Sequence, residues 1–339
     1  MKATIVIPTI REGSIKRFLK EWGDYFKKNK VRVIVVEDNP QKMFKISGVE
    51  HYAWDDIEKD LGTNSWIIPR RTSGVRDYGF LKALEKPTDI VVTTDDDCLM
   101  VENADDFLLT HYNNLYTSQK VKRWISTEAS GKHVRGVPYE NLESEVNCVI
   151  SHGYWLNIPD LDAIHQLVYG GEQGYKPFVG VVPRDRYFSL SSMNFSFKPE
   201  VTVLVYQILN GENPGGHKYP FNRTDDIWAG VLAKKVCDHL NLGVHTGSPL
   251  VWHDKASNPF VNLQKEVPAM SVNEGFWKYV DNIQLSGTCI EECYQEIADH
   301  LQTEPLDGLD YWRKLGCAMS KWIREVSLRM ENQKSTTTS

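Results

Sequence analysis

The sequence predicts an α/β fold with a parallel sheet, and two observations carry that prediction. Short apolar runs at 3–7, 31–36 and 90–94 have the length and composition of buried strands. The segments 14–28 and 75–85 place apolar residues at helical spacing between them. Because strand–helix–strand units with short links form parallel sheets with right-handed crossovers, we expect the three strands to share one sheet.

The pattern divides the chain into three parts. Residues 1–265 are predicted to form the main domain, with long loops and mixed strands in its glycine- and proline-rich middle. Residues 266–331 are predicted to be helical and to pack back on that domain, because their apolar residues recur at helical spacing. The polar residues 332–339 are predicted to be a disordered tail.

Composition limits the classes of function. A net charge of −6 argues against a protein that wraps nucleic acid, because neutralising phosphates requires clustered Lys and Arg. No run approaches the roughly 20 apolar residues of a membrane span, and the N-terminal segment lacks a signal-peptide pattern. The six scattered cysteines are expected to be reduced thiols. The sequence therefore predicts a cytoplasmic protein without membrane insertion, and it is compatible with a homo-oligomer.

Three adjacent carboxylates directly follow the apolar run 90–94. Asp95, Asp96 and Asp97 repel one another, so a buried strand end tolerates them best beside a cation. On an extended backbone Asp95 and Asp97 point the same way, and hard oxygen ligands suit Mn²⁺ or Mg²⁺. The sequence therefore predicts a divalent-metal site there, and the competing interpretation is a solvated acidic turn.

A second apolar run, 249–252, is followed by a further candidate metal ligand. His253 is predicted to complete the metal site with an imidazole nitrogen that suits Mn²⁺, although a histidine near aromatic residues is more often simply hydrogen-bonded. Lys255 and Asn258 in the loop that follows are candidates for contact with phosphates or sugar hydroxyls. Ordinary loop chemistry is the alternative for both.

Basic and acidic residues at other element ends suggest a nucleotide ligand. Arg76 opens a predicted helix, where the positive helix end would help it bind a diphosphate. Asp38 follows a predicted strand and is a candidate acceptor for a ribose or a base, with a turn-forming role as the alternative. Asp225 and Asp226 open another helix, where the helix dipole alone favours acidic residues but a sugar-binding carboxylate also fits.

Taken together, an ordered set of short motifs resembles the reversibly glycosylated polypeptides, a family of UDP-arabinopyranose mutases best known from plants. The matching segments are 5–11, 95–98, 134–136 with Pro138, 151–153, 155–160, 193–194, 225–226, 228–230, 237–240, 252–253 and 255–263. They follow the same order from residue 5 to about 266. An aspartate triplet alone is a weak signal, whereas this ordered set is highly specific.

The resemblance implies a GT-A-like nucleotide-diphosphosugar domain with a mixed, largely parallel sheet flanked by helices. It implies a Mn²⁺- or Mg²⁺-bound UDP-sugar and interconversion of UDP-L-arabinopyranose and UDP-L-arabinofuranose. The arginine that is reversibly glycosylated in the family corresponds to Arg135, which would act through a glycosyl-arginine or by trapping an oxocarbenium-like species. On the matched motifs, Asp225 and Asp226 are expected to be catalytic. Substrate contacts are expected from Pro8, Thr9, Arg11, Asp96, His152 and Asn194.

Three other functions compete with the mutase. A retaining glycosyltransferase acting on an external acceptor would use the same metal site. A self-glycosylating subunit without catalysis would lack metal or arginine residues, and both are present here. A sugar nucleotidyltransferase would carry a glycine-rich loop after the first strand, where residues 8–11 read Pro-Thr-Ile-Arg instead.

Overall fold

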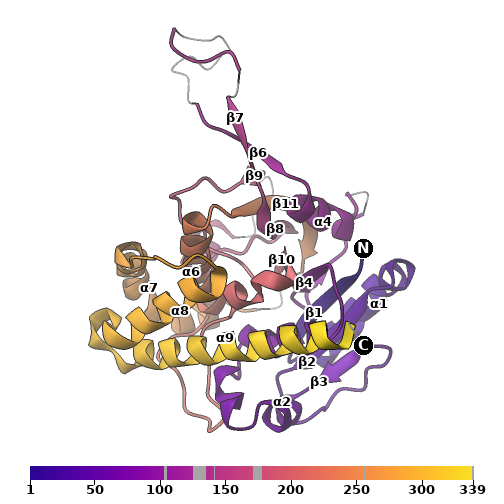
Figure 1. Ribbon diagram of the computed structural model, residues 1–339. Helices are drawn as coiled ribbons and strands as arrows, with labels where there is room; N and C mark the ends of the chain where they lie inside the picture. Colours follow the sequence, from indigo (N-terminus) through magenta and orange to yellow (C-terminus); the bar gives the residue numbers. More distant parts are fainter. Residues whose placement is uncertain (103–104, 125–134, 141, 171–177, 255–256, 338–339) are drawn as a thin grey trace.

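The computed structural model covers the 339-residue chain and describes all of it except residues 103–104, 125–134, 141, 171–177, 255–256 and 338–339 (Figure 1). Its centre is a nine-stranded mixed sheet in the order β3-β2-β1-β4-β10-β8-β11-β5, with β9 paired to β11. The strands are β1 (Ala3–Thr9), β2 (Arg32–Glu37), β3 (Glu50–Tyr52), β4 (Ile90–Thr94), β5 (Cys98–Leu99), β8 (Cys148–Asn157), β9 (Gly180–Val181), β10 (Asn194–Phe197) and β11 (Gly243–His253).

Most of the sheet runs in one direction. Strands β3, β2, β1 and β4 are all parallel neighbours. Strand β10 is antiparallel to both β4 and β8, and β8 is parallel to β11, so β8 and β11 run the same way as β1. Only β5, β9 and β10 run against them among the described strands. The predicted fold class, α/β with a mixed and largely parallel sheet flanked by helices, is confirmed.

The alternation of β1 side chains explains the layers. Ile5 and Ile7 join the core under helix α1 (Glu12–Asn29), whose buried face includes Phe18 and Trp22. Val6 points to the opposite face, where helix α3 (Arg76–Ala83) packs. Because side chains alternate along a strand, one apolar run supplies both faces of a buried sheet. Gly79 allows the close approach of α3, since a Cβ there would lie 2.3 Å from Val6 Cγ1.

The C-terminal helices pack on the face that carries α3 (Figure 1). They are α6 (Asp225–His239), α7 (Pro259–Asn282), α8 (Ile290–Thr303) and α9 (Asp310–Thr337). Trp228 of α6, Phe276 of α7 and Trp312 of α9 form an aromatic cluster with ring centroids 5.0–5.4 Å apart. Burying large aromatic surfaces between elements far apart in sequence is a strong stabilising contribution. It explains why the helical region packs on the main domain.

Two predicted boundaries differ from the structure. Helix α7 begins at Pro259 and continues to Asn282, so the boundary expected after residue 265 falls inside a helix. Helix α9 extends to Thr337, so residues 332–337 are helical where the sequence predicts a disordered tail. Helix propagation adds one hydrogen bond per residue once a helix has formed, which lets polar residues continue an established helix.

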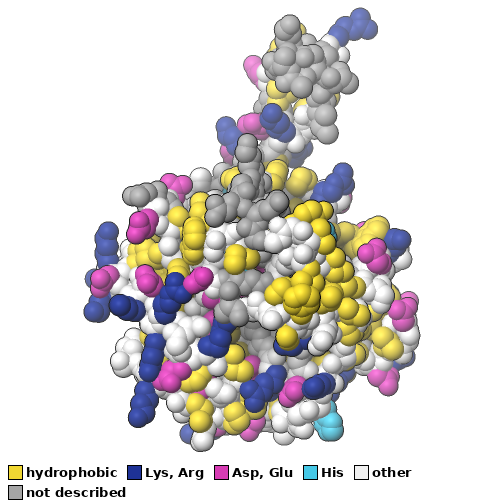
Figure 2. All heavy atoms as spheres, turned by 180° about the vertical axis from the view of Figure 1, so that it is seen from behind, with side chains coloured by type: hydrophobic (Ala, Val, Ile, Leu, Met, Phe, Trp, Pro, Cys, Tyr) yellow, Lys and Arg dark blue, Asp and Glu magenta, His cyan; other side chains and the backbone are white. Residues whose placement is uncertain are grey.

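A two-stranded arm projects from the body of the molecule (Figures 1 and 2). It is built by β6 (Gln119–Lys122) and β7 (Glu143–Val146), which pair with each other and with no strand of the main sheet among the described residues. The remaining helices are α2 (Trp54–Leu61), α4 (Phe107–Tyr116) and α5 (Ala163–Tyr169), and 3₁₀ turns lie at Gly62–Ile67, Ser73–Val75, Pro199–Val205 and Leu306–Gly308. In the part of the chain that is described, every helix is too short or too polar to cross a membrane.

Candidate active site

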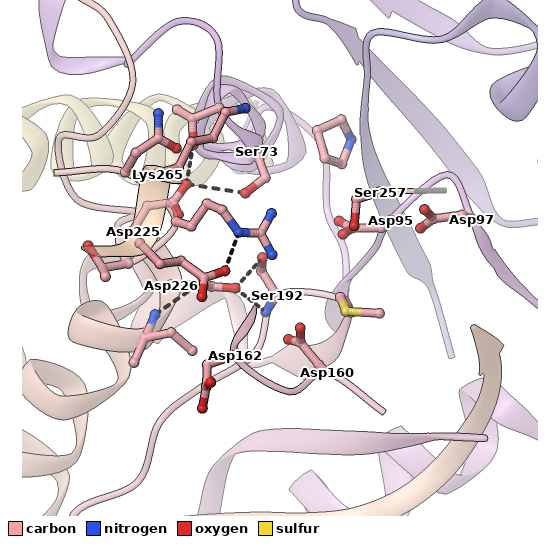
Figure 3. Close-up of a pocket in the computed structure, with 18 of the residues that line it drawn as sticks. Ser73, Asp95, Asp97, Asp160, Asp162, Ser192, Asp225, Asp226, Ser257 and Lys265 are labelled. Carbon is pink, nitrogen blue, oxygen red and sulfur yellow. Dashed lines mark hydrogen bonds and ion pairs between the residues drawn. The ribbon is translucent and has the colours of Figure 1, made fainter. Parts of the chain in front are cut away.

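A cavity of about 910 Å³ opens at the carboxyl ends of β1, β2 and β4. Ligands of open α/β sheets bind at this edge, and the volume lies within the roughly 300–1,000 Å³ of small-molecule sites. Of the residues predicted from the sequence, the cavity is lined by Pro8, Thr9, Arg11, Asp38, Asp95, Asp96, Asp97, Asp225, Asp226 and His253. In the view of Figure 3, Asp95 and Asp97 lie on one side of the cavity and Asp225 and Asp226 on the other.

The aspartate triplet is held by arginines from two elements. Asp96 accepts a hydrogen bond from Thr9 Oγ1 at 2.6 Å and pairs with Arg11. Arg11 Nη2 also lies 3.1 Å from Asp97 Oδ2. Burial raises the pKa of Asp96 to about 6, although Arg11 and Thr9 act in the opposite direction. Burial, followed by repulsion from Asp95, also raises the pKa of Asp97. The end of β4 therefore holds carboxylates whose charge is costly without a cation.

Arg76 acts inside the protein rather than in the cavity. Its guanidinium is completely buried, pairs with Asp95, and donates to Thr93 Oγ1 at 2.8 Å and to the Ser192 carbonyl at 2.5 Å. Arg76 is absent from the cavity lining, so the predicted direct contact with a diphosphate is not seen. Arg76 is the first residue of α3, and its side chain points toward β4. Its guanidinium group has four hydrogen-bond acceptors there: Asp95, Thr93, and the carbonyls of Ser192 and Ser73.

His253 lies beside the triplet, as the metal prediction requires. The backbone of Asp254 donates to the Asp97 carbonyl at 2.9 Å, and His253 is in register with Cys98. His253 Nδ1 lies 2.7 Å from the Ile158 carbonyl, so Nδ1 donates to that oxygen and Nε2 is the nitrogen that would bind a metal. A hydrogen bond from the ring nitrogen that does not bind the metal is the usual way in which a protein orients a metal-binding histidine.

The chemical types of the candidate ligand atoms fit a divalent ion. Two carboxylates and an imidazole suit Mn²⁺ or Mg²⁺. Arg76 pairs with one oxygen of Asp95, and Arg11 pairs with one oxygen of Asp97. Within the described residues, no three His, Cys, Asp or Glu side chains are gathered as a ready-made metal site. The metal therefore stays a prediction.

Asp38 is fixed by the first residue of α2 and by the backbone of one loop residue. Its Oδ1 accepts from Trp54 Nε1 at 2.8 Å and from the Arg71 backbone at 3.1 Å. Arg71 adopts a left-handed backbone (φ 57°), and its guanidinium lies 4.9 Å from the Trp54 ring. Burial raises the pKa of Asp38. Trp54 was missed by sequence reasoning, because a tryptophan that opens a helix gives no local sign of a distant partner.

The opposite wall of the cavity carries a second acidic group. Asp225 Oδ2 accepts from Thr72 Oγ1, from Ser73 Oγ at 3.2 Å and from the Gly74 backbone at 3.1 Å, so it fixes the 72–74 turn. Asp226 Oδ2 accepts from both the backbone and Oγ of Ser192 at 2.8 Å. Burial, then Asp225 and Asp160, raise the pKa of Asp226 to about 7. Asp225 is therefore committed to structure, and Asp226 is poised to hold a proton near neutral pH.

Three residues of this wall were not predicted. Asp160 Oδ2 accepts from Ser191 Oγ at 2.6 Å, and Asp160 lines the cavity. Arg223, with a left-handed backbone (φ 62°), donates from Nε to Glu266 at 2.8 Å. Glu266 also accepts from the Ala163 backbone at 2.8 Å, which ties α5 and α7 to the cavity. Asp160 is the last residue of the family-matching segment 155–160, and this match could have identified it as a site residue.

Several predicted site residues lie elsewhere. His152 and Asn194 are buried and line no part of the cavity. His152 Nδ1 bonds Thr246 Oγ1 at 3.0 Å, and Asn194 Nδ2 donates to the Pro249 carbonyl at 2.9 Å, so both join the strands from within. Asn258 caps α7 by accepting from the Phe260 backbone at 2.9 Å. Lys255 falls outside the described residues.

Arg135 is not brought to the cavity. It is exposed and follows β6 in the projecting arm. It is absent from the cavity lining, so the residue predicted to carry the sugar lies apart from the other candidates. A motif of three residues does not predict that Arg135 lies on an arm separate from the sheet.

The fold and the cavity define the chain as an α/β protein with an acidic pocket at the ends of its parallel strands. Sequence comparison gives the family. The model for "Reversibly glycosylated polypeptide" matches residues 2–330, and the chain belongs to that family.

Named relatives and solved structures were also found. The chain is 36% identical to "Probable UDP-arabinopyranose mutase 4" of Arabidopsis thaliana, over 94% of this chain and 88% of the relative. It is 34% identical to "UDP-arabinopyranose mutase 1" of Oryza sativa subsp. japonica, again over 94% and 88%. Among solved structures, S. aureus TarS 1-349 aligns with a TM-score of 0.41 and 12% identity, over 99% of this chain and 92% of that one.

Proposed function

We propose that this protein binds a UDP-sugar in the cavity and interconverts UDP-L-arabinopyranose and UDP-L-arabinofuranose. The observation that carries the proposal is the 34–36% identity to relatives named for that activity, over 94% of the chain. That span is long enough to include both acidic walls of the cavity. Each part of such a substrate is proposed to have a partner among the residues that line the cavity.

The nucleotide end is proposed to lie beside Asp38. Trp54 and the Arg71 backbone occupy Oδ1, which leaves the carboxylate anchored with its other oxygen available to a ribose or to a uracil N–H. A carboxylate held by two donors is preorganised as an acceptor. The adjacent Arg71 lines the cavity, and its guanidinium is proposed to supply a planar cation beside the nucleotide.

The diphosphate is proposed to lie at the end of β4. Arg11 already spans Asp96 and Asp97 there and can turn toward an incoming phosphate oxygen. Asp95, Asp97 and His253 would hold Mn²⁺ or Mg²⁺. When bound, that ion would neutralise the diphosphate and favour its departure. Without a cation, the buried carboxylates would repel the diphosphate.

The sugar is proposed to face the second acidic wall. Asp226 and Asp160 offer oxygens to its hydroxyls, and Arg223 offers the N–H groups that Glu266 does not engage. Arg135 lies outside the cavity in this structure, so the binding proposal does not depend on it. Its glycosylation is a separate prediction.

The test is incubation of the purified protein with UDP-L-arabinopyranose and Mn²⁺, with the nucleotide-sugars separated by chromatography. We expect UDP-L-arabinofuranose to accumulate to a constant ratio, and the same ratio to be reached from the furanose. Asp226→Asn is the matched inactive control, because the amide keeps the shape of the side chain. Free UDP together with a glycosylated acceptor, or no conversion at all, would contradict the proposal.

A further inference from the structure

We propose that Asp160 and Asp226 work as a pair that carries one proton and moves it between two oxygens of the bound sugar. This inference rests on the proposed mutase activity and adds a catalytic role for Asp160. It begins from the chemistry of the ring change and from the way the two carboxyl groups are held.

Changing a pyranose into a furanose requires one proton to move within the sugar. The O4 hydroxyl loses its proton as it becomes the ring oxygen, and the former ring oxygen O5 gains one as it becomes a hydroxyl. This exchange is needed whatever the order of events at C1. An enzyme that performs the reaction therefore needs one base and one acid on the sugar side of the pocket.

Consecutive serines hold the two carboxyl groups on the same wall. Ser191 Oγ donates to Asp160 Oδ2 at 2.6 Å, whereas the Ser192 backbone and Oγ donate to Asp226 Oδ2 at 2.8 Å. Both aspartates line the cavity, and Figure 3 shows them on the side where Ser192 lies. Neighbouring anchors on one backbone segment fix the spacing of the two groups without using up their remaining acceptor capacity.

The surroundings give the two groups different roles. The charged groups that face Asp226 are Asp225 beside it on α6, Asp160, and Arg223, which Glu266 of α7 holds in place. Burial and both neighbouring carboxylates raise the pKa of Asp226. Burial, with a smaller contribution from Asp95, also raises the pKa of Asp160, whereas Ser191, Arg223 and His253 favour its charged form. Because Arg223 and His253 both favour the charged form of Asp160, we assign the proton to Asp226 and the carboxylate role to Asp160.

The proposed step conserves atoms and charge. Asp160 accepts the proton of O4–H while the O4 electron pair forms the C1–O4 bond. The C1–O5 bond breaks, its electron pair stays on O5, and O5 takes the proton of Asp226. The sugar keeps its composition, and the pair ends with its one proton on Asp160, ready for the reverse direction. No further reactant is required.

Other carboxylates near the cavity are less suited to this role. Asp225 Oδ2 already accepts three donors of the 72–74 turn. Asp162 is roughly half exposed, pairs with His165 and caps α5 through the His165 backbone. Both side chains are occupied by local structure, which leaves Asp160 as the partner of Asp226.

Asp160→Asn and Asp226→Asn test the pair, with Asp281→Asn on the outer part of α7 as the matched control. Each of the first two is expected to lower kcat by about 100-fold or more, the usual scale of acid–base catalysis, with KM changed less than about threefold. UDP affinity by calorimetry and thermal midpoint should match the control. If one variant fails to fold, the other carries the test, because the pair predicts the same loss for both.

The pH profile separates catalysis from a structural role. Wild-type kcat is expected to fall as pH rises through about 7, where Asp226 loses its proton. That fall should vanish from the residual activity of Asp226→Asn. In Asp160→Asn it should move to lower pH, because the charge of Asp160 no longer raises the pKa of Asp226. An Asn variant with kcat within threefold of wild type, or with an unchanged pH profile, would overturn the pair. A wild-type protein without any interconversion would instead remove the proposed function on which the pair rests.

Discussion

The buried guanidinium of Arg76, at the start of α3, forms an ion pair with Asp95 at the end of β4. The same side chain bonds Thr93 of β4 and the Ser192 carbonyl, so one arginine connects the two walls of the cavity from behind. Asp95 is partly exposed to the cavity, whereas Arg76 is not exposed at all. The pair therefore sets the position of a predicted metal ligand from inside the protein.

Arg76→Ala is expected to destabilise the fold strongly. It would leave Asp95 and the Ser192 carbonyl without their buried partner, and removing one member of a buried pair costs about 3–5 kcal/mol. The measurement is the free energy of unfolding in urea. Arg17→Ala, which breaks the exposed pair with Asp254, is the control and should cost less than about 1 kcal/mol. Equal losses for the two variants would show that Arg76 has no special structural role.

Asp97→Ala is expected to abolish Mn²⁺-dependent binding of UDP. The diphosphate would lose the cation that Asp97 helps to hold, although the nucleotide contacts at Asp38 would remain. Calorimetry with and without Mn²⁺ measures the effect, and chelation of the metal should reproduce it in the wild-type protein. Asp254→Asn, the exposed neighbour of His253, serves as control. Unchanged UDP affinity of Asp97→Ala in the presence of Mn²⁺ would remove Asp97 from the metal site.

Arg135→Ala is expected to leave UDP binding intact and to remove any sugar adduct of the protein. Arg135 is exposed and lies outside the cavity, so its loss should change stability by no more than about 0.5 kcal/mol. Intact-mass spectrometry after incubation with the UDP-sugar detects the adduct. Arg123→Ala, at the residue that follows β6 on the same arm, is the control. An adduct that persists in Arg135→Ala would move the glycosylated residue elsewhere.

His152→Phe is expected to change acid stability without changing UDP binding. The ring packs edge-on against Trp155 and Phe188 at 5.5 and 5.1 Å, and phenylalanine can keep those contacts. Burial lowers the pKa of His152 to about 3, so the unfolded chain takes up a proton below about pH 6.5 while the folded chain does not. The stability from this histidine is complete above that pH and is lost as pH falls toward 3.

Wild type and His152→Phe are expected to differ in how steeply the free energy of unfolding changes with pH. Between pH 6 and 4, the free energy of unfolding of His152→Phe should fall less steeply than that of wild type, by about 1.4 kcal/mol per pH unit. Urea titrations at several pH values measure it. Parallel pH curves would contradict the assignment of His152 as a buried neutral residue. A lost affinity for UDP would instead return it to the binding site.

The strands and the acidic strand end could be predicted because both signals are local. Ile90–Thr94 is entirely buried and is followed at once by Asp95. The apolar run therefore predicts the strand, and the first aspartate predicts where the strand ends. Parallel strands of one sheet then bring their carboxyl ends to the same edge, which places Asp38 near the triplet. No long-range information is needed for either conclusion.

The remaining site residues depend on contacts between distant segments. Asp160 and Asp226 meet through Ser191 and Ser192, which lie more than thirty positions from either aspartate in the sequence. His152 and Asn194 occur in motifs that match the family, yet they serve the sheet from within. A motif match indicates that a residue is required. It does not distinguish a residue that binds the ligand from one that stabilises the core.

A crystal structure with UDP and Mn²⁺ would show directly whether the end of β4 binds the metal and the diphosphate. We expect the metal beside Asp95, Asp97 and His253, with the diphosphate on it and the base toward Asp38. A nucleotide bound outside this cavity, with the triplet still paired only to Arg11 and Arg76, would contradict it.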